Sequence, residues 1–281
     1  MISFEDPLIL SFIDFKKPGK MNIKKRFNYS QYKFVQLLII AFLVLTSVGM
    51  AFKPKPKVLV FFKTVGYHHQ SIAVGKLAIQ KLGAENGFDV DTTADAEKIN
   101  FENLKQYKAV IFLSTTGDIL NDEQQEAFKK YIESGGGFMG IHAATDCEYD
   151  WPWYGNLVGA YFGGHPQQQT ATLHIIDKNN ISTKHLPDPW TRKDEWYSFK
   201  WMAPGLHELI TIDESSYDLG KIKPMGHHPM AWYHEYDGGR AFYTELGHTD
   251  ESFADPLYLK HILGGIEYAM GMKHYKKLKV D

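Results

Sequence analysis

The stretch Gly135-Gly-Gly-Phe-Met-Gly-Ile-His-Ala-Ala-Thr-Asp146 decides how the rest of the chain is interpreted. Its glycines are typical of a helix end, residues 138–141 are predicted to form a short buried strand, and His142 begins the following connection. Ligands of open parallel sheets bind beyond the carboxyl ends of the strands. The imidazole of His142 and the carboxyl group of Asp146 are therefore candidates for chemistry, although a hydrogen-bonded core histidine would give the same pattern.

Before this stretch, apolar strand patterns alternate with helical patterns. Strands are predicted at residues 58–62, 88–93 and 109–113, and the alternating polarity of the second places it near a sheet edge. Ser71 is expected to cap a helix that ends at Gly87, with apolar positions at Ile72, Leu77, Ile79 and Leu82. A short helical turn is expected at residues 100–106. Asn121 and Gln124 have the spacing of a capping box at the start of a further helix.

This alternation predicts an α/β fold, a three-layer sandwich with a mostly parallel, doubly wound central sheet. In the second half, strands are expected at residues 170–176 and 208–212. Residues 230–236 and 240–246 read as a hairpin with the Asp237-Gly238 pair in its turn. Pro256 opens a closing helix that runs to about Met270.

Composition limits the class of protein. The chain has 281 residues, 44% of them hydrophobic, which is enough for a large core, and a formal net charge of −2. This balance gives no electrostatic reason to expect a nucleic-acid partner. Cys147 is the single cysteine, so neither an intramolecular disulfide nor a cysteine-built zinc site is expected, and it is predicted to be a small buried residue.

The N-terminal region resembles a targeting segment. Basic residues at 24–26 precede an apolar run from Phe34 to Val48, followed by small residues up to Ala51. We expect residues 1–52 to contain a signal peptide, with translation starting at Met21 and cleavage near Ala51. The mature protein is then expected to be periplasmic or extracellular. An uncleaved segment that anchors the protein to the membrane is the alternative. Residues 273–281 are expected to form a solvated basic tail.

Histidines and carboxylates concentrate in predicted loops and at strand ends. Both types serve general acid-base catalysis, and histidine is the commonest metal ligand. No histidine pair has the helical spacing of a zincin motif, so a divalent metal site would have to combine separate loops. No Gly-x-Ser-x-Gly elbow is present, and the elbow-like position carries the imidazole of His142.

Aromatic residues lie beside these groups in three clusters, which suggests a pocket of carbohydrate size. Rings can stack on the apolar faces of sugars while neighbouring polar groups bind hydroxyls, although single tryptophans are more often core residues. The candidate substrate-binding residues are Trp151, Trp153, Tyr154, Trp196, Tyr197, Trp232 and Tyr243.

Seven motifs together resemble the ThuA-like (trehalose utilisation) family over residues 57–272. They include Thr64-Val-Gly-Tyr-His-His-Gln-Ser-Ile72, residues 136–146, Trp151-Pro-Trp-Tyr154, Gly164-His-Pro166, Asp194-Glu-Trp-Tyr197, residues 228–232 and residues 239–249. The resemblance implies a flavodoxin-like variant of the class I glutamine amidotransferase fold. It has lost the nucleophilic cysteine of its elbow, and His68 stands where family members often have arginine.

The resemblance implies a role in the use of trehalose or related disaccharides, on keto-glycosides made by a partner sugar oxidoreductase. The matching candidate catalytic positions are His69, His142, Asp146, His165, Glu195, His228 and His248. We expect His142 as base and Glu195 as acid, and the other histidines to orient the sugar or hold a divalent metal. The alternatives are a non-catalytic carbohydrate-binding or sensing protein, and a metal-dependent hydrolase.

Overall fold

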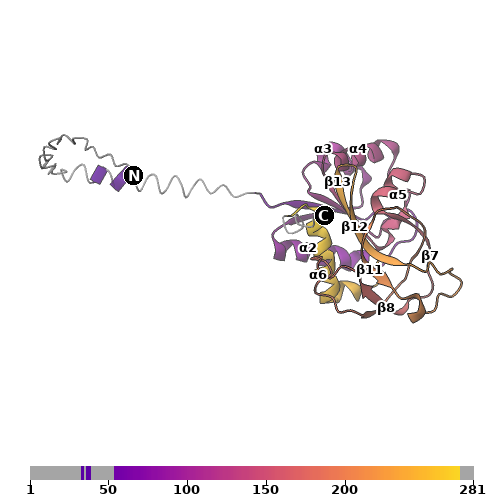
Figure 1. Cartoon of the computed structure of the whole chain (residues 1–281). Coiled ribbons are helices and arrows are strands. Elements are labelled where there is room, and N and C mark those ends of the chain that lie inside the picture. Colours follow the sequence, from indigo (N-terminus) through magenta and orange to yellow (C-terminus); the bar gives the residue numbers. More distant parts are fainter. Residues whose placement is uncertain (1–32, 35, 39–53, 273–281) are drawn as a thin grey trace, which may run out of the picture. The chain divides into compact units, whose positions relative to one another are not determined.

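The computed structural model describes residues 33, 34, 36–38 and 54–272. Residues 1–53 and residues 54–281 form two separate units, and the described part of the second unit contains the sheet and all the elements discussed below (Figure 1). Residues 33, 34 and 36–38 are helical. Within the described residues, no helix combines the length and apolar character needed to cross a bilayer. The expected cleavage site near Ala51 and the basic tail at 273–281 lie outside the described residues.

The first half of the main sheet is parallel. Its strands lie in the order β2 (Asp89–Thr93), β1 (Lys57–Phe61), β3 (Ala109–Leu113), β5 (Gly137–Ile141) and β13 (Gly239–Thr244). Every residue of β3 and β5 is buried, as expected for strands covered on both faces. The strands predicted near 58–62, 88–93, 109–113 and 138–141 are confirmed, and the alternating strand β2 does lie at a sheet edge.

The prediction of a mostly parallel sheet is wrong, because the nine-stranded sheet is mixed. Beyond β13 the order continues with the antiparallel strands β12 (Pro229–Tyr236), β11 (His207–Ile212), β8 (Gln169–Ile175) and β9 (Trp190–Asp194). The predicted hairpin of β12 and β13 produces the change of direction. Asp237 and Gly238 both have positive φ in its turn, at 48° and 87°. Its second strand pairs in parallel with β5, while its first strand starts the antiparallel half.

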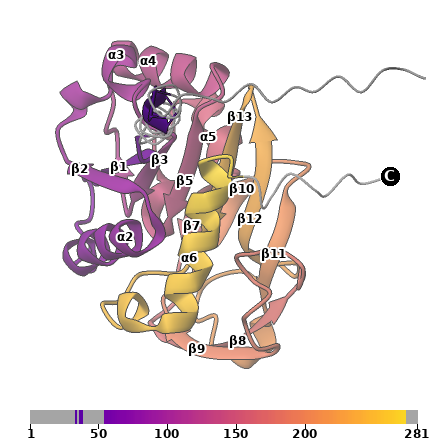
Figure 2. The same ribbon diagram turned by 90° about the vertical axis from the view of Figure 1, so that its left-hand side faces the viewer.

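Helices cover both faces of this sheet, which gives three layers (Figure 2). One face packs against α2 (Ile72–Asn86) and α6 (Pro256–Ala269), which contribute Ile79, Ile262 and Ile266 to a core cluster. The other packs against α3 (Phe101–Leu104), α4 (Asp122–Glu133) and α5 (Pro152–Val158), which contribute a second cluster. Successive strand residues alternate between the two clusters, as the pleat requires.

The predictions made for helices α2 and α4 are confirmed in part. The capping box of α4 is confirmed, because the Asn121 side chain accepts from the Gln124 amide and the Gln124 side chain accepts from the Asn121 amide. Helix α2 ends at Gly87 in the left-handed region, as expected. The capping role of Ser71 is wrong, since its hydroxyl donates to the carbonyl oxygen of Gly247 instead. Leu77 is also wrong as a core position, because it is 66% exposed.

Two small sheets at the strand ends were not predicted. β7 (Ala160–Gly164) pairs with β10 (Ser198–Met202), and β4 (Thr116–Gly117) pairs with β6 (Asp146–Cys147). Short 3₁₀ segments lie at Ala96–Lys98, His142–Thr145, Glu214–Ser216 and Ser252–Ala254. The β7–β10 pair leads into and out of two candidate residues, His165 and Tyr197, and therefore positions part of the site.

Candidate active site

His142 occupies a strained turn at the carboxyl end of β5. Its φ is 51°, a left-handed value that is uncommon for a residue other than glycine. The Nδ1 atom lies 2.7 Å from the backbone carbonyl oxygen of Glu245, so Nδ1 carries the proton and donates it to that carbonyl. The Nε2 atom therefore presents a lone pair when the ring is neutral. The side chain is fully buried.

Three further side chains from separate loops meet His142 here. His69 follows β1, Glu195 follows β9 and His248 follows β13. One donor atom of each of the four residues lies within 4.8 Å of the others. His142 Nε2 is 3.1 Å from His248 Nδ1, which is in turn 2.9 Å from Glu195 Oε2. The structure thus brings together four of the residues that the sequence nominated.

The three imidazole rings of this His-Glu cluster (His69, His142, Glu195 and His248) surround a common point. Their centroids are 4.8 Å, 5.1 Å and 5.0 Å apart, and the rings cross at 89°, 85° and 79°. At such angles the edge of one ring meets the face of its neighbour, and one nitrogen of each ring lies within 4.8 Å of the others. Ring edges carry the nitrogen atoms, so the arrangement gathers donors instead of stacking apolar faces.

Asp194 holds the loops of the cluster together. Its Oδ1 accepts from the backbone amides of Glu195 and His248, at 3.1 Å and 3.0 Å. Its Oδ2 accepts from the amide of Gly247 and from Arg192 and Ser252. The carboxylate is fully buried, so these contacts are not screened by water. One side chain therefore fixes the positions of two cluster members.

Charges within the cluster depend on burial. Burial, together with the neighbouring His142 and His248, lowers the pKa of His69 to about 2, so His69 is neutral near pH 7. Burial opposes ionisation of Glu195, but hydrogen bonds from His142 and His248 outweigh it and hold the pKa of this carboxyl well below its usual range. Burial raises the pKa of Glu245 well above its ordinary value. The cluster thus contains the carboxylate of Glu195 beside the neutral ring of His69.

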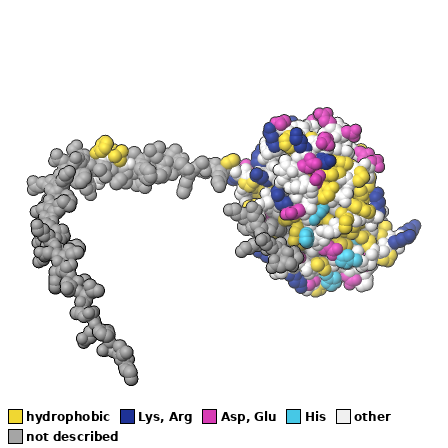
Figure 3. Space-filling model, turned by 45° about the horizontal axis from the view of Figure 1, so that its top comes forward, with side chains coloured by type: hydrophobic (Ala, Val, Ile, Leu, Met, Phe, Trp, Pro, Cys, Tyr) yellow, Lys and Arg dark blue, Asp and Glu magenta, His cyan; other side chains and the backbone are white. Residues whose placement is uncertain are grey.

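A pocket of about 390 Å³ opens onto the cluster. Asp146 and His165 line it beside members of the cluster; the lining residues are Tyr67, His69, Asp146, Phe162, His165, Gln168, Glu195, Tyr197 and His248. His142 is not among them and lies behind the others. Histidine side chains gather beside acidic and hydrophobic ones on the face of the second unit drawn in Figure 3.

Asp146 and His165 differ in their proton chemistry. Burial raises the pKa of Asp146, although the hydroxyl of Tyr149 donates to its Oδ1 at 2.6 Å. His165 Nδ1 lies 2.9 Å from the carbonyl oxygen of Pro166 and 3.2 Å from Glu195 Oε1. Both neighbours are acceptors, so Nδ1 carries a proton, and Nε2 of His165 presents a lone pair when the ring is neutral.

His228 is the one candidate histidine that belongs neither to the cluster nor to the lining of the pocket. Its Nε2 lies 2.8 Å from the carbonyl oxygen of Tyr197 and its Nδ1 lies 3.0 Å from Glu214. Burial lowers its pKa. His228 therefore braces the backbone beside a pocket residue and is placed to position Tyr197, not to touch a ligand in this pocket.

Most of the nominated aromatic residues lie in the core. Trp196 and Trp232 are fully buried, with their indole N–H groups donating to the carbonyl oxygens of Gln169 and Val158. Tyr154 and Tyr243 are also fully buried. Trp151 and Trp153 stack on each other with ring centroids 4.9 Å apart, and neither lines the pocket. Only Tyr197 of this set lines the pocket, so the expected wall of indole rings is not formed there.

Tyr67 and Phe162 supply aromatic rings to the pocket instead, and sequence reasoning did not single them out. Tyr67 is 66% exposed and packs edge-on against His69 at 4.8 Å. Phe162 contacts Tyr197 at 4.2 Å. Each stands two or three residues from a nominated histidine, which was the available signal. Glu245 was also missed, because a buried glutamate at the end of a strand has no sequence signature.

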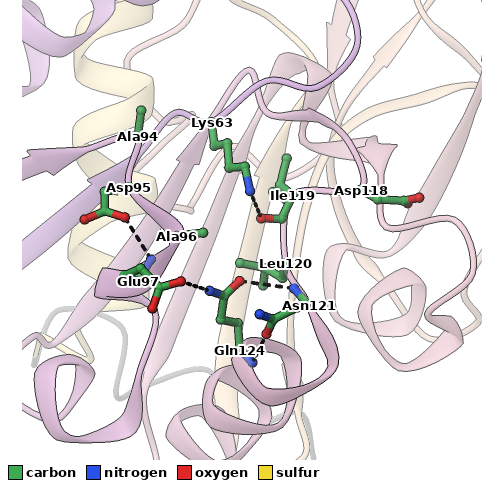
Figure 4. A pocket seen from close by; sticks show the side chains of 10 residues that line it. All are labelled: Lys63, Ala94, Asp95, Ala96, Glu97, Asp118, Ile119, Leu120, Asn121 and Gln124. Atoms are coloured by element: carbon green, nitrogen blue, oxygen red, sulfur yellow. Dashed lines mark hydrogen bonds between the residues drawn. The ribbon is translucent and has the colours of Figure 1, made fainter.

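A larger pocket of about 500 Å³ lies elsewhere and has a different character (Figure 4). Most of its polar side chains are already paired with one another or with the backbone. Lys63 donates to the carbonyl oxygen of Ile119, Gln124 donates to Glu97, and Asp95 accepts from the amide of Glu97. These contacts cap helices and close loops, so they do not form a reaction centre.

Cys147 is fully buried, as predicted. Burial raises the pKa of its thiol to about 12. The thiol donates to the carbonyl oxygen of Ala144, which lies in the preceding 3₁₀ turn, at 3.3 Å. A protonated, inaccessible thiol is a poor nucleophile. Thiol catalysis therefore has no support at this position.

Comparison with known proteins places the chain in a family. The family model described as "ThuA: Trehalose utilisation" matches residues 57–269. A ThuA-like protein from Bacteroides uniformis superposes with a TM-score of 0.67 at 24% identity, covering 79% of this chain and 94% of that one. A ThuA-like protein from Parabacteroides merdae gives a TM-score of 0.62 at 21% identity, covering 78% and 91%.

A more distant likeness is limited to the fold. The β-galactosidase of Rahnella sp. R3 gives a TM-score of 0.50 at 14% identity over 86% of this chain, but this covers 35% of that enzyme. Its activity is therefore not transferred to this chain. Among curated proteins, none matches the sequence significantly.

Proposed function

Because the chain belongs to the ThuA family of trehalose utilisation, we propose that it is an exported enzyme that cleaves a disaccharide or keto-glycoside by acid-base chemistry. The single observation that carries this proposal is the convergence of His69, His142, His248 and Glu195 beneath a pocket lined by Asp146 and His165. Export is inferred from the basic and apolar pattern of residues 24–51.

The scaffold supports a relationship to class I glutamine amidotransferases. The parallel strands β2, β1, β3, β5 and β13 follow the flavodoxin order 2-1-3-4-5. His142, with its positive φ, occupies the strand-end turn where those enzymes place a nucleophile. An imidazole with both nitrogens engaged cannot attack a carbonyl carbon in that way, so amidotransfer is not proposed.

A 3-keto-glycoside is the substrate class that best fits these groups. The C3 carbonyl acidifies the C2–H bond, so a base can remove that proton. The electrons of C2–H then form a C1–C2 double bond as the C1–O bond to the leaving sugar breaks, and an acid protonates the departing oxygen. Cleavage of this kind needs a base, an acid and a site for the keto oxygen, but no strong nucleophile.

The pocket offers one group for each task. His165, with a free Nε2 and an Nδ1 held by Pro166 and Glu195, serves as the base. Asp146, whose pKa burial raises, serves as the acid. The cluster at the floor receives the keto oxygen. We place base and acid here, and not at His142 and Glu195, because His142 is fully buried and does not line the pocket.

Aromatic rings and a partner enzyme complete the proposal. Tyr67, which is 66% exposed, provides a face on which a sugar ring can stack. A sugar oxidoreductase would have to form the keto group before cleavage. The second candidate function, a carbohydrate-binding or sensing module, is favoured by the same exposed ring and by the absence of the elbow thiol.

Incubation of the purified protein with trehalose and with a 3-keto disaccharide tests the proposal. We expect monosaccharide release from the keto sugar, and a loss of about 10²- to 10⁴-fold in rate for His165→Ala, the usual contribution of one positioned acid or base. Binding of the keto sugar without any release, in the wild type as in His165→Ala, would support the binding module and overturn the enzyme assignment.

A further inference from the structure

We propose that His69, His142, His248 and Glu195 together bind one divalent first-row transition-metal ion, such as Zn²⁺. The binding of the ion stands on the geometry of the four donors alone. Its use in turnover, as the electrophile that receives the keto oxygen, rests on the proposed function.

Three of the separations between donor atoms lie near the edges of a coordination shell, and the donor of His69 lies within 4.8 Å of the other three. Ligand bonds of about 2.0–2.1 Å place neighbouring donors about 2.9–3.4 Å apart in octahedral and tetrahedral shells. His248 Nδ1 lies 2.9 Å from Glu195 Oε2 and 3.1 Å from His142 Nε2, and His142 Nε2 lies 3.5 Å from the same Glu195 oxygen. These three atoms therefore form one face around a common centre.

The unpaired atom of His69 adds an independent observation. His69 is 2% exposed, and its Nδ1 has no hydrogen-bond partner among the described residues. A buried polar atom without a partner is unfavourable, so native structures rarely keep one without a reason. The ring faces His142 and His248 edge-on at 4.8 Å and 5.1 Å. An ion at the centre would give this ring a charged partner.

Supporting contacts are those expected around a metal centre. Metal-binding histidines commonly donate the other ring N–H to a carbonyl or carboxylate, which fixes the tautomer. His142 does so, since its Nδ1 donates to the carbonyl oxygen of Glu245 at 2.7 Å. Asp194 in turn holds the backbone amides of Glu195 and His248. The ligands are thus oriented before any ion arrives.

The donor set favours one class of ion. Three imidazoles and one carboxylate suit zinc and its first-row neighbours, whereas Ca²⁺ and Mg²⁺ prefer oxygen ligands. His69, His248 and Glu195 also line the pocket, so the coordination positions that the protein leaves open face the space where a substrate would lie. A catalytic metal site requires such an open position.

Metal content measured on the untagged protein tests this inference. After chelation and dialysis, the protein is titrated with Zn²⁺ and Co²⁺, and bound metal is counted by mass spectrometry. We expect about one equivalent per chain, and visible absorption from bound Co²⁺. If the protein sample contains no more of either ion than buffer without protein, the inference is overturned.

Variants locate the ion. His248→Ala and Glu195→Gln should each weaken binding at least about 100-fold, since removal of an outer contact alone typically costs 10- to 100-fold. His227→Ala is the matched control, because His227 is an exposed histidine that pairs with Glu208 outside the cluster. It should still bind one equivalent. Retention of metal by both cluster variants, with circular dichroism unchanged, would contradict the assignment.

His165→Ala separates the metal site from the proposed reaction. This variant should keep its metal and lose turnover of the 3-keto disaccharide. Metal-free protein with full turnover would overturn the use of the ion in turnover and leave the enzyme assignment standing, while the titration alone decides whether the ion binds. Stoichiometric metal without turnover on any keto sugar would retain the site and overturn the proposed reaction.

Discussion

Asp194 is the residue on which the geometry of the cluster depends most. It accepts from the amides of Glu195, Gly247 and His248 and pairs with Arg192 at 3.0 Å, entirely out of contact with water. Removal of one partner from a buried charged network typically costs 3–5 kcal/mol, because the other charge stays buried without compensation.

We therefore expect Asp194→Asn to lower the free energy of unfolding by about 3 kcal/mol and to slow turnover, while Asp250→Asn changes both little. Asp250 is a suitable control because its partly exposed carboxylate accepts from Gln70 at 3.3 Å. Urea unfolding and keto-sugar turnover check the pair. Equal stability of the two variants would show that Asp194 does not hold the loops.

Tyr67 tests the sugar-stacking role of the pocket wall. Tyr67→Ala should raise KM for the keto disaccharide about three- to tenfold with kcat nearly unchanged, as for a loss of roughly 0.5–1.5 kcal/mol of ring contact. Val65→Ala, at a neighbouring residue that is 61% exposed, should leave KM unchanged. Steady-state kinetics distinguish the outcomes, and an unchanged KM for Tyr67→Ala would remove the ring from the binding surface.

The sequence nominated the four residues of the cluster, but it assigned most of the aromatic residues to the pocket when they lie in the core. His69, His142, Glu195 and His248 were nominated together, and they do meet. Trp196 and Trp232 were nominated as sugar contacts, but their indole N–H groups donate to backbone carbonyls inside the core. The sequence around a tryptophan looks the same whether its indole lines a pocket or packs in the core. Only the folded structure distinguishes the two cases.

At the scale of single elements, the capping box of α4 was predicted because its hydrogen bonds join residues three apart. The reciprocal contacts of Asn121 and Gln124 lie at 2.9 Å and 3.1 Å. The Ser71 cap failed for the opposite reason, since its hydroxyl found a partner 176 residues away. Local signals give helix ends only when no distant acceptor competes.

Asn121→Ala should lower the free energy of unfolding by about 1 kcal/mol, the typical cost of an N-cap. For a domain of this size that corresponds to a decrease of about 2–4 °C in Tm, measurable by differential scanning calorimetry. Asn121→Ser, which keeps a capping oxygen, should recover most of the loss. A Tm for Asn121→Ala equal to the wild type would show that the box contributes nothing.

The sheet shows that correctly predicted strands do not determine how those strands pair. Both strands of the hairpin β12–β13 and its Asp237-Gly238 turn were predicted, yet the conclusion of a mostly parallel sheet was wrong. A hairpin pattern does not state which sheet it joins. Here β13 pairs with β5 and β12 pairs with β11, so one hairpin links a parallel half to an antiparallel half.

At the scale of the whole molecule, buried histidines make stability depend on pH. His261 is fully buried between the carbonyl oxygen of Ser182 and the hydroxyl of Thr244, and burial lowers its pKa to about 3. Below about pH 6.5 the unfolded chain takes up a proton here that the folded chain does not. The free energy of unfolding therefore falls as pH decreases from about 6.5 toward 3, by up to about 1.4 kcal/mol per pH unit.

His261→Gln, which keeps a donor and an acceptor, should flatten this dependence. Urea unfolding at pH 6.5, 5.5 and 4.5 gives the slope of stability against pH for each protein. We expect the wild-type slope to be steeper by about one proton over the lower part of this range. Parallel slopes for the two proteins would show that His261 does not titrate in this way.

The account as a whole depends on Glu195, which joins the cluster to the pocket wall through His248 at 2.9 Å and His165 at 3.2 Å. The most direct test is the rate at which Glu195→Gln releases monosaccharide from a 3-keto disaccharide, compared with the wild type. We predict a decrease of at least about 100-fold with secondary structure unchanged, because Glu195 positions His165 and belongs to the cluster that receives the keto oxygen. A rate within a factor of about two of the wild type would contradict the central claim that these side chains form one reaction centre.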